Sequence, residues 1–168
     1  MSQSSFVAIL MGSDSDLPVI EIVFKELRHF GIPFEVRILS AHRTPDLIAE
    51  YIHDADQRGC AIYIAAAGLA AHLAGAVAAH TIKPVIGIPL AVGDLHGLDA
   101  LLATVQMPSG TPVACTAIGK AGAKNAAHLA AQILALQDEN IANKIKQQRQ
   151  TKRGDLLRAN EKLQMQLA

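Results

Sequence analysis

Runs of apolar residues alternate with segments of helical periodicity along most of the chain. An unbroken apolar run at residues 6–11 (FVAILM) predicts a buried strand, and apolar side chains in residues 17–30 recur at the spacing of an amphipathic helix. The same alternation continues downstream. It predicts strands at residues 34–39, 60–66, 84–88 and 112–118, and helices at residues 45–57, 70–79 and from residue 125 to about 137.

Strands that lack polar alternation, each followed by a helix, are typical of a parallel sheet with helices on both faces. We therefore expect an α/β fold, a three-layer sandwich with a doubly wound parallel sheet in flavodoxin-like strand order. Residues 89–110 carry no strong pattern and predict a long irregular connection. A connection of this length is usually a binding loop or a subunit contact.

The length of 168 residues predicts a single domain, with a core at about residues 6–138 and a C-terminal helical extension at about residues 139–168. The extension is polar and rich in basic residues, with a sparse apolar stripe. We interpret it as an extended helix, broken near Gly154, that docks on a neighbouring subunit because the stripe needs a cover. A solvated terminus is the alternative.

Composition narrows the class of protein. Lysine plus arginine and aspartate plus glutamate number 15 each, and this balance weighs against a nucleic-acid partner, which requires clustered positive charge. Hydrophobic residues make up 51% and charged residues 18%, with no tryptophan. Many small apolar residues and few charges favour a homo-oligomer, although an alanine-rich monomer core is also compatible with them.

The sequence also indicates where the protein resides. Cys60 and Cys115 lie in apolar runs without CxxC spacing, so we expect free thiols in a reducing compartment rather than a disulfide or a metal site. The N-terminal segment lacks the positive charge and cleavage site of a secretory signal. No run is apolar enough to predict a membrane span. We therefore expect a cytoplasmic protein without membrane contact.

Candidate chemistry follows the predicted strands, because ligands of such sheets bind beyond the carboxyl ends of the strands. After the first strand, Ser13 offers a hydroxyl and the following helix offers N–H groups to an anion. Asp16 is expected either to cap that helix or to hold sugar hydroxyls. After the second strand, Arg43 can pair with a phosphate, and His42 can accept and return a proton near neutral pH.

Other positions carry weaker signals. No acidic residue ends the third strand, which excludes a phospho-accepting receiver domain. His72 falls inside the predicted helix at residues 70–79, and we interpret it as a packing residue, which leaves His42 as the one histidine expected at the site. Lys120 follows the fifth strand and is able to serve an anion, but its glycine-rich turn is equally suited to close helix packing.

Five segments together resemble a known family. They occur in order and without large gaps: MGSDSD (11–16), SAHRTP (40–45), AAHLAG (70–75), VQMPSG (105–110) and AIGKAGAKNAAHLAAQIL (117–134). Over about residues 6–138 the chain resembles the bacterial-type (class I) 5-(carboxyamino)imidazole ribonucleotide mutases of purine biosynthesis, also described as the catalytic subunit of phosphoribosylaminoimidazole carboxylase.

The resemblance implies a flavodoxin-like homo-octamer that moves a carboxyl group from the exocyclic nitrogen of a nucleotide substrate to its imidazole ring carbon, without a metal or organic cofactor. His42 matches the catalytic histidine, and Ser13, Asp16 and Arg43 match substrate-binding residues. In the family's mechanism the histidine acts as an acid, the carbon dioxide released is held in a small pocket and attacked by the ring carbon, and the same histidine removes the ring proton.

The chain departs from the family's GAGGAAHLPG motif, because Leu69 and Ala66 replace glycines and Ala74 replaces the proline. This loop is expected to line the carbon dioxide pocket, so the pocket is expected to differ in shape. Arg43, where a carboxylase of the animal type has lysine, favours the mutase. Two alternatives remain: an aminoimidazole ribonucleotide carboxylase that uses free carbon dioxide, and a flavin- or nucleotide-binding module, which would require aromatic residues that the predicted site loops lack.

Overall fold

Five parallel strands form the central sheet of this computed structural model, which describes residues 5–167. Their order across the sheet is β2-β1-β3-β4-β5, so the predicted flavodoxin-like α/β fold is confirmed. The strands are β1 (Phe6–Met11), β2 (Phe34–Ile38), β3 (Cys60–Gly68), β4 (Val85–Leu90) and β5 (Ala114–Cys115). The helices that follow them are α1 (Leu17–Phe30), α2 (Pro45–Gln57), α3 (Leu73–Ala78), α4 (Leu98–Val105) and α5 (Lys120–Leu134).

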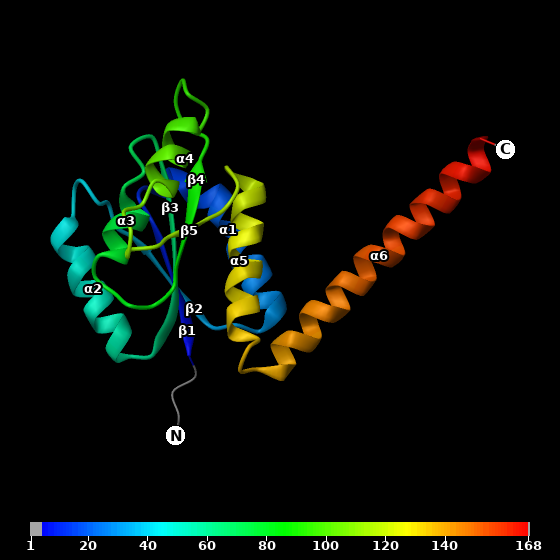
Figure 1. Ribbon diagram of the computed structural model, residues 1–168, viewed down its shortest axis with the longest axis horizontal. Helices are drawn as coiled ribbons and strands as arrows, with labels where there is room; N and C mark the ends of the chain where they lie inside the picture. Colours follow the sequence, from blue (N-terminus) through cyan, green and yellow to red (C-terminus); the bar gives the residue numbers. More distant parts are fainter. Residues whose placement is uncertain (1–4, 168) are drawn as a thin grey trace. The chain divides into compact units, whose positions relative to one another are not determined.

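The helices cover both faces of the sheet, with α1 and α5 on one side and α2, α3 and α4 on the other (Figure 1). Successive side chains of a strand point to opposite faces, so β1 is buried along its whole length. Ala8 and Leu10 pack in a cluster with Ile52 of α2, Tyr63 of β3 and Leu73 of α3. The uniformly apolar strands thus pack against the helices on both faces of the sheet.

Short local signals fix where the helices end and begin. Gly31 adopts the left-handed conformation (φ 75°) and closes α1 through N–H bonds to the carbonyl groups of Leu27 and Arg28. Pro45 occupies the first turn of α2, where its missing N–H is not required. Thr44 stands at the cap position of α2, but its side chain makes no capping hydrogen bond.

The structure corrects several predicted boundaries. The connection at residues 89–110 contains helix α4, which is only 8 residues long and has no side-chain capping hydrogen bond. Strand β5 has only two residues, β3 extends to Gly68, and α5 begins at Lys120 rather than at residue 125. Helix α3 begins at Leu73, which leaves residues 70–72 outside the helix. This last difference changes the composition of the site.

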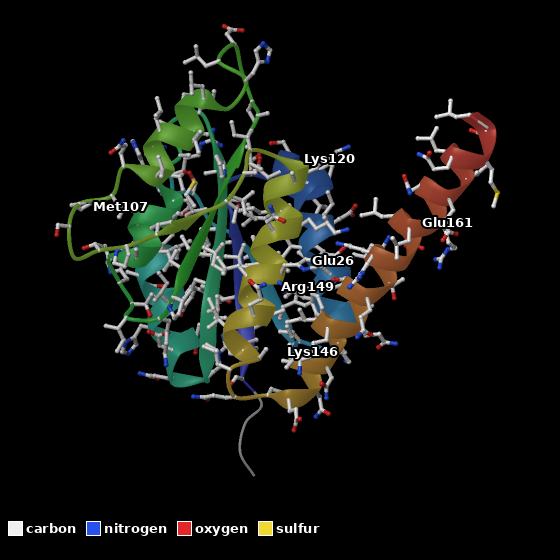
Figure 2. The ribbon with its side chains drawn as sticks, turned by 45° about the vertical axis from the view of Figure 1, so that its right-hand side comes forward. Glu26, Met107, Lys120, Lys146, Arg149 and Glu161 are labelled. Carbon is white, nitrogen blue, oxygen red and sulfur yellow. The ribbon has the colours of Figure 1, made fainter. Side chains whose placement is uncertain are left out.

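The chain divides into two compact units, at residues 1–130 and 131–168, and the second is described here by itself. It contains the end of α5 and the long helix α6 (Glu139–Leu167), from which Lys146, Arg149 and Glu161 project (Figure 2). Asp138 caps α6 by accepting hydrogen bonds from the N–H groups of Asn140 and Ile141. None of the helices in residues 5–167 has the length and apolar character needed to cross a membrane.

The break predicted near Gly154 is wrong, because α6 continues through that residue without interruption. A single glycine costs about 1 kcal/mol relative to alanine in a helix. The residues around Gly154 are mostly strong helix formers, such as Arg153 and Leu156, and their combined preference outweighs that cost.

Candidate active site

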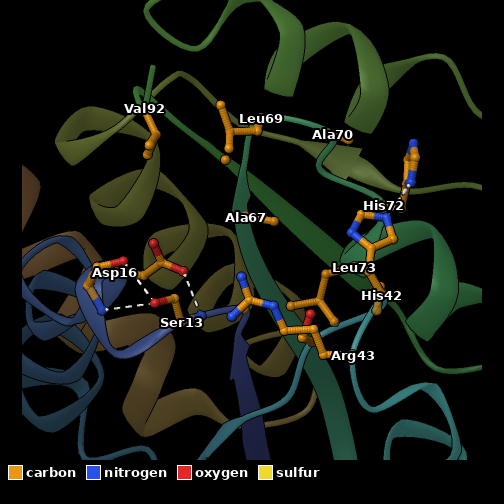
Figure 3. A pocket seen from close by; sticks show the side chains of 15 residues that line it. Ser13, Asp16, His42, Arg43, Ala67, Leu69, Ala70, His72, Leu73 and Val92 are labelled. Atoms are coloured by element: carbon orange, nitrogen blue, oxygen red, sulfur yellow. Dashed lines mark hydrogen bonds between the residues drawn. The ribbon is translucent and has the colours of Figure 1, made fainter.

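A pocket of about 370 Å³ lies beyond the carboxyl ends of β1, β2 and β3 (Figure 3). In the observed strand order, β2 and β3 lie on opposite sides of β1, so the connections after these strands separate and leave a crevice. The pocket is lined by short segments that follow four strands: Gly12, Ser13, Ser15 and Asp16 after β1; Ser40, Ala41, His42 and Arg43 after β2; Ala67, Gly68, Leu69, Ala70, His72 and Leu73 at and after the end of β3; and Val92 after β4.

The segment after β1 is a one-turn 3-10 helix (Asp14–Asp16) held by its own side chains. The Ser13 hydroxyl accepts a hydrogen bond from the N–H of Ser15 (3.3 Å), and Asp16 Oδ2 accepts one from the N–H of Ser13 (3.1 Å). This reciprocal pair is a capping box. The expectation that free N–H groups would face an anion is therefore corrected for Ser13 and Ser15, since both N–H groups are already bonded within the loop.

Asp16 takes part in the capping box and also lines the pocket. Its side chain is buried, with 8% of the residue exposed, and it lines the pocket beside Ser13. Burial raises the pKa of the Asp16 carboxyl, although the N–H groups of Ser13 and Gly12 act in the opposite direction. The two readings of Asp16 from the sequence, as a helix cap and as a ligand-binding residue, are thus geometrically compatible.

The segment after β2 is a tight turn that carries His42 and Arg43. Thr44 closes this turn rather than capping α2: its hydroxyl accepts from the N–H of Ser40 (3.0 Å) and donates to the Ser40 carbonyl oxygen (3.2 Å). Arg43 extends from the turn towards Ser13 and Asp16 (Figure 3). Within residues 5–167, its guanidinium takes part in no ion pair or hydrogen bond, so all its donors face the pocket or solvent.

His42 lies against a second histidine. Its Nε2 is 2.8 Å from Nδ1 of His72, and the two rings are nearly perpendicular, at 87°. The sequence interpretation of His72 as a packing residue is wrong. Because α3 begins at Leu73, His72 stands just before the helix, exposed on the pocket side. Its position shortly after the end of β3, like that of His42 shortly after β2, was the signal that could have found it.

The contact between the two rings limits how many protons the pair can hold. Only one hydrogen atom fits between Nε2 of His42 and Nδ1 of His72, so one of these nitrogens is always an acceptor. While the contact persists, the pair therefore carries at most one positive charge. A pair of this kind can take up one proton and give it back, which is the behaviour of a general acid and base.

All four residues selected from the sequence, Ser13, Asp16, His42 and Arg43, line this one pocket. Lys120 does not line it; it begins α5 (Figure 2). The thiols of Cys60 and Cys115 also lie outside it, and burial raises the pKa of both. Among the described residues, no group of three or more His, Cys, Asp and Glu side chains is arranged to hold a metal ion.

Comparison with known proteins identifies the family of the chain. The family model described as AIR carboxylase matches residues 6–155, which is most of the sequence. The chain belongs to the AIR carboxylase family. The resemblance drawn from the five motifs is thereby confirmed, and the pocket described above lies within the matched region of this family member.

Individual relatives agree with this assignment. The chain is 47% identical to the N5-carboxyaminoimidazole ribonucleotide mutase of Bacillus subtilis, over 94% of this chain and 97% of that protein. It is 51% identical to the protein of the same name from Vibrio vulnificus, over 83% and 86% of the two chains. The crystal structure of Treponema denticola PurE superposes with a TM-score of 0.86 at 32% identity, covering 95% of this chain and 98% of that chain.

The burial of Asp16 leads to a prediction about stability. A carboxyl group whose pKa is raised by folding favours the folded state at low pH, and this contribution is lost as pH rises through the folded-state pKa. Asp16→Asn keeps an oxygen acceptor for the Ser13 N–H and removes the buried charge. We expect the variant to be at least as stable as the parent at pH 7, in thermal unfolding, and to lose any advantage below a pH of about 4.

Asp16→Ala serves as the control, because it deletes the cap itself. It should lower the free energy of unfolding by about 1 kcal/mol at both pH values. An Asp16→Asn variant that is clearly less stable than the parent at pH 7 would show that the charge of this carboxylate stabilises the fold.

Proposed function

We propose that this protein is a 5-(carboxyamino)imidazole ribonucleotide mutase, an isomerase of purine biosynthesis that produces 5-amino-1-(5-phospho-D-ribosyl)imidazole-4-carboxylate. Relatives with the corresponding name match it over most of both chains. The observation that carries the proposal is the position of His42: it lines a pocket of nucleotide size, together with a second imidazole and an arginine that has no partner among residues 5–167.

The pocket offers each part of such a nucleotide a suitable group. Arg43 presents a planar set of donors that matches a phosphate, and no carboxylate in the described part of the chain is paired with it. The hydroxyls of Ser13 and Ser15 lie next to each other in the segment after β1, and both residues line the pocket. Asp16 provides a carboxylate that can accept hydrogen bonds from ribose hydroxyls. We assign substrate binding to Ser13, Asp16 and Arg43, with the imidazole of the substrate directed towards His42.

The proposed reaction requires one proton to move twice. In the first half, the bond between the exocyclic nitrogen and the carboxyl carbon breaks, its electron pair stays on nitrogen, and His42 donates a proton there while carbon dioxide forms. In the second half, the electron-rich ring carbon forms a bond to carbon dioxide, and His42 removes the ring proton. The proton count of His42 is the same before and after, and no metal or organic cofactor is assigned to either step.

We assign His72 a positioning role in this cycle. Its ring nitrogen, 2.8 Å from Nε2 of His42, fixes the orientation of the catalytic ring. When His42 holds the extra proton, His72 can accept the hydrogen bond between the rings and thus stabilise the charged form. When His42 is neutral, His72 can become the donor. The pair therefore suits a group that must act as acid and then as base.

The proposal is tested by incubating the purified protein with the carboxyamino nucleotide and following formation of the carboxylated product. We expect rapid conversion without added bicarbonate. Aminoimidazole ribonucleotide with dissolved carbon dioxide is the comparison substrate, and preferential use of that mixture would replace the mutase by the alternative carboxylase. Binding of a flavin without either activity would instead support a cofactor-binding module.

His42→Asn should abolish most of the activity while leaving the fold intact. Loss of a positioned acid and base typically costs about 10²–10⁴-fold in rate, so kcat should fall at least this far. The measurement is steady-state turnover, with circular dichroism and thermal unfolding to verify folding. Near-normal kcat in the folded variant would remove His42 from the mechanism.

His72→Asn provides the matched comparison, since it removes the partner but not the proton donor. We expect a smaller loss of kcat and a change in the pH dependence of kcat, because the ring of His42 then lacks its hydrogen bond to the neighbouring imidazole. A pH profile identical to that of the parent would show that His72 has only a structural role.

Substitutions at Arg43 and Asp16 should affect binding more than chemistry. Arg43→Lys keeps the charge but loses the two-pronged geometry, and Asp16→Asn keeps the cap but loses the charged acceptor. We expect KM to rise about tenfold or more in each, the equivalent of one hydrogen bond to a charged group. Some kcat should also be lost, because binding positions the imidazole. An unchanged KM in Asp16→Asn would restrict Asp16 to capping.

We also propose that the enzyme is a cytoplasmic homo-oligomer, an octamer as the resemblance implies, built from a core at residues 6–138 and a helical extension at residues 139–168. The free thiols suit a reducing compartment. The support for assembly is a row of exposed apolar side chains at helical spacing on and just before α4, at residues Leu95, Leu98, Leu102 and Val105. An isolated subunit would leave this row in water.

Light scattering should therefore return a mass well above that of one chain at micromolar concentration. Leu102→Glu, which places a charge in the α4 row, should reduce the mass, whereas charge reversal at the exposed Lys25 of α1 serves as the control. A parent protein that is monomeric under these conditions would overturn the proposed assembly.

A further inference from the structure

Helix α6 has a basic face whose charges are not neutralised within the described residues. Residues 140–154 include five lysine and arginine residues and no acidic residue. Of these, Arg149 (Figure 2), Lys152 and Arg153 are exposed, and none of the three forms an ion pair in the described part of the chain. Leu156 follows on the same side of the helix and is 72% exposed. This face therefore changes from basic to apolar along α6.

Helix α2 has an exposed face of the opposite charge. Residues 45–57 include four acidic residues and no lysine or arginine. Glu50 and Asp54 are exposed, one turn apart on the same side of the helix. Within the described residues, Glu50 takes part in no ion pair, and Asp54 is bonded to Arg58 through Oδ2 alone. Leu47 lies on this side as well, one turn before Glu50, and is 44% exposed. This face therefore changes from apolar to acidic along α2.

The two faces match each other in charge and in spacing. On α2 the apolar and the two acidic side chains follow one another at intervals of three and then four residues. On α6 the two arginines and the leucine follow at intervals of four and then three. When two such helices lie antiparallel, the intervals coincide, because the order of one helix is reversed. The facing pairs are then Leu47 with Leu156, Glu50 with Arg153, and Asp54 with Arg149. Two of these pairs join a carboxylate to a guanidinium, which is a favourable geometry for paired hydrogen bonds.

We propose that α6 of one subunit docks antiparallel on α2 of a second copy of this chain, with these three pairs in contact. This inference rests on the homo-oligomer proposed above and is independent of the catalytic steps. Helices α2 and α5 lie on opposite faces of the sheet (Figure 1), and only residues 135–138 join α5 to α6. Because so short a connection keeps the start of α6 near the end of α5, the α2 of another chain is the better acceptor.

The side chains of α6 also leave room for those of a partner helix. A hollow of about 430 Å³ opens between them, and it is lined by Arg149, Lys152, Arg153, Leu156, Leu157 and Asn160. Exposed ion pairs contribute little individually and are screened by salt. Within an oligomer, however, the partner helix is present at a high effective concentration, so a weak contact is populated. The pairing thus orients the helical extension, whereas the row of apolar side chains at α4 supports the assembly.

Zero-length cross-linking of the full chain with a water-soluble carbodiimide tests the pairing. The reagent joins an amine to a carboxylate only where the two groups touch. Arg153→Lys keeps the positive charge and supplies the amine. We expect covalent dimers on a denaturing gel, and mass spectrometry of the peptides should show position 153 joined to Glu50. The yield of this cross-link should fall several-fold in 1 M sodium chloride, because exposed ion pairs are screened.

Charge reversals in this background test the register. Arg149→Glu would oppose Asp54 of the partner subunit, so the cross-link between position 153 and Glu50 should decrease several-fold. Arg158→Glu is the matched control, because it makes the same change on the opposite side of α6 and should leave the yield close to that of the starting variant. Arg149→Glu combined with Asp54→Arg exchanges the two charges and should restore the cross-link. Circular dichroism verifies that each variant keeps its helices.

The remaining outcomes overturn the proposal. A cross-link found only in chains of monomer mass would place the contact within one chain. Cross-links from α6 mainly to carboxylates outside α2, or equal losses in Arg149→Glu and Arg158→Glu, would exclude the proposed register. Binding of a duplex oligonucleotide without any cross-link to α2 would assign the basic face to nucleic acid. A monomeric parent would refute the proposed assembly together with this pairing, and the turnover assay for the mutase would remain a separate result.

Discussion

The position of β1 between β2 and β3 is the constraint on which the site depends. The chain leaves β1 for an edge strand on one side and later returns to pair with β1 on the other, so the segments after β1, β2 and β3 diverge around one crevice. Residues far apart in the sequence, such as Asp16, His42 and His72, are thereby brought to one pocket. The sheet itself supplies no chemistry, but its parallel order determines which segments can cooperate.

Hydrogen bonds within and between the segments then hold the residues that line the pocket. The capping box of Ser13 and Asp16 satisfies the N–H groups of the first segment, and the Thr44 hydroxyl closes the turn that carries His42 and Arg43. The His42–His72 contact joins the second segment to the third. Arg43 is the exception, since its guanidinium has no partner among the described residues and is available to an anionic ligand.

The apolar side of the pocket follows a different principle. There, Leu69 and Val92 are held by close packing against Gly93 and Gly68, and a strained backbone at Leu69 accompanies the contact. One side of the pocket thus presents charged and hydrogen-bonding groups, and the other presents apolar side chains.

The sequence by itself determined the parallel α/β fold, the order of its elements and four residues of the pocket, because uninterrupted apolar strands and strand-end motifs are local signals. It missed α4, which is short and has no side-chain capping hydrogen bond, and misjudged Gly154, where neighbouring residues outweigh a single glycine. Only the tertiary structure decided that His72 lies outside α3 and against His42, and that Leu69 packs on Gly93. Contacts of this kind join segments 24 to 30 residues apart, and their geometry is set by strand pairing rather than by local preference.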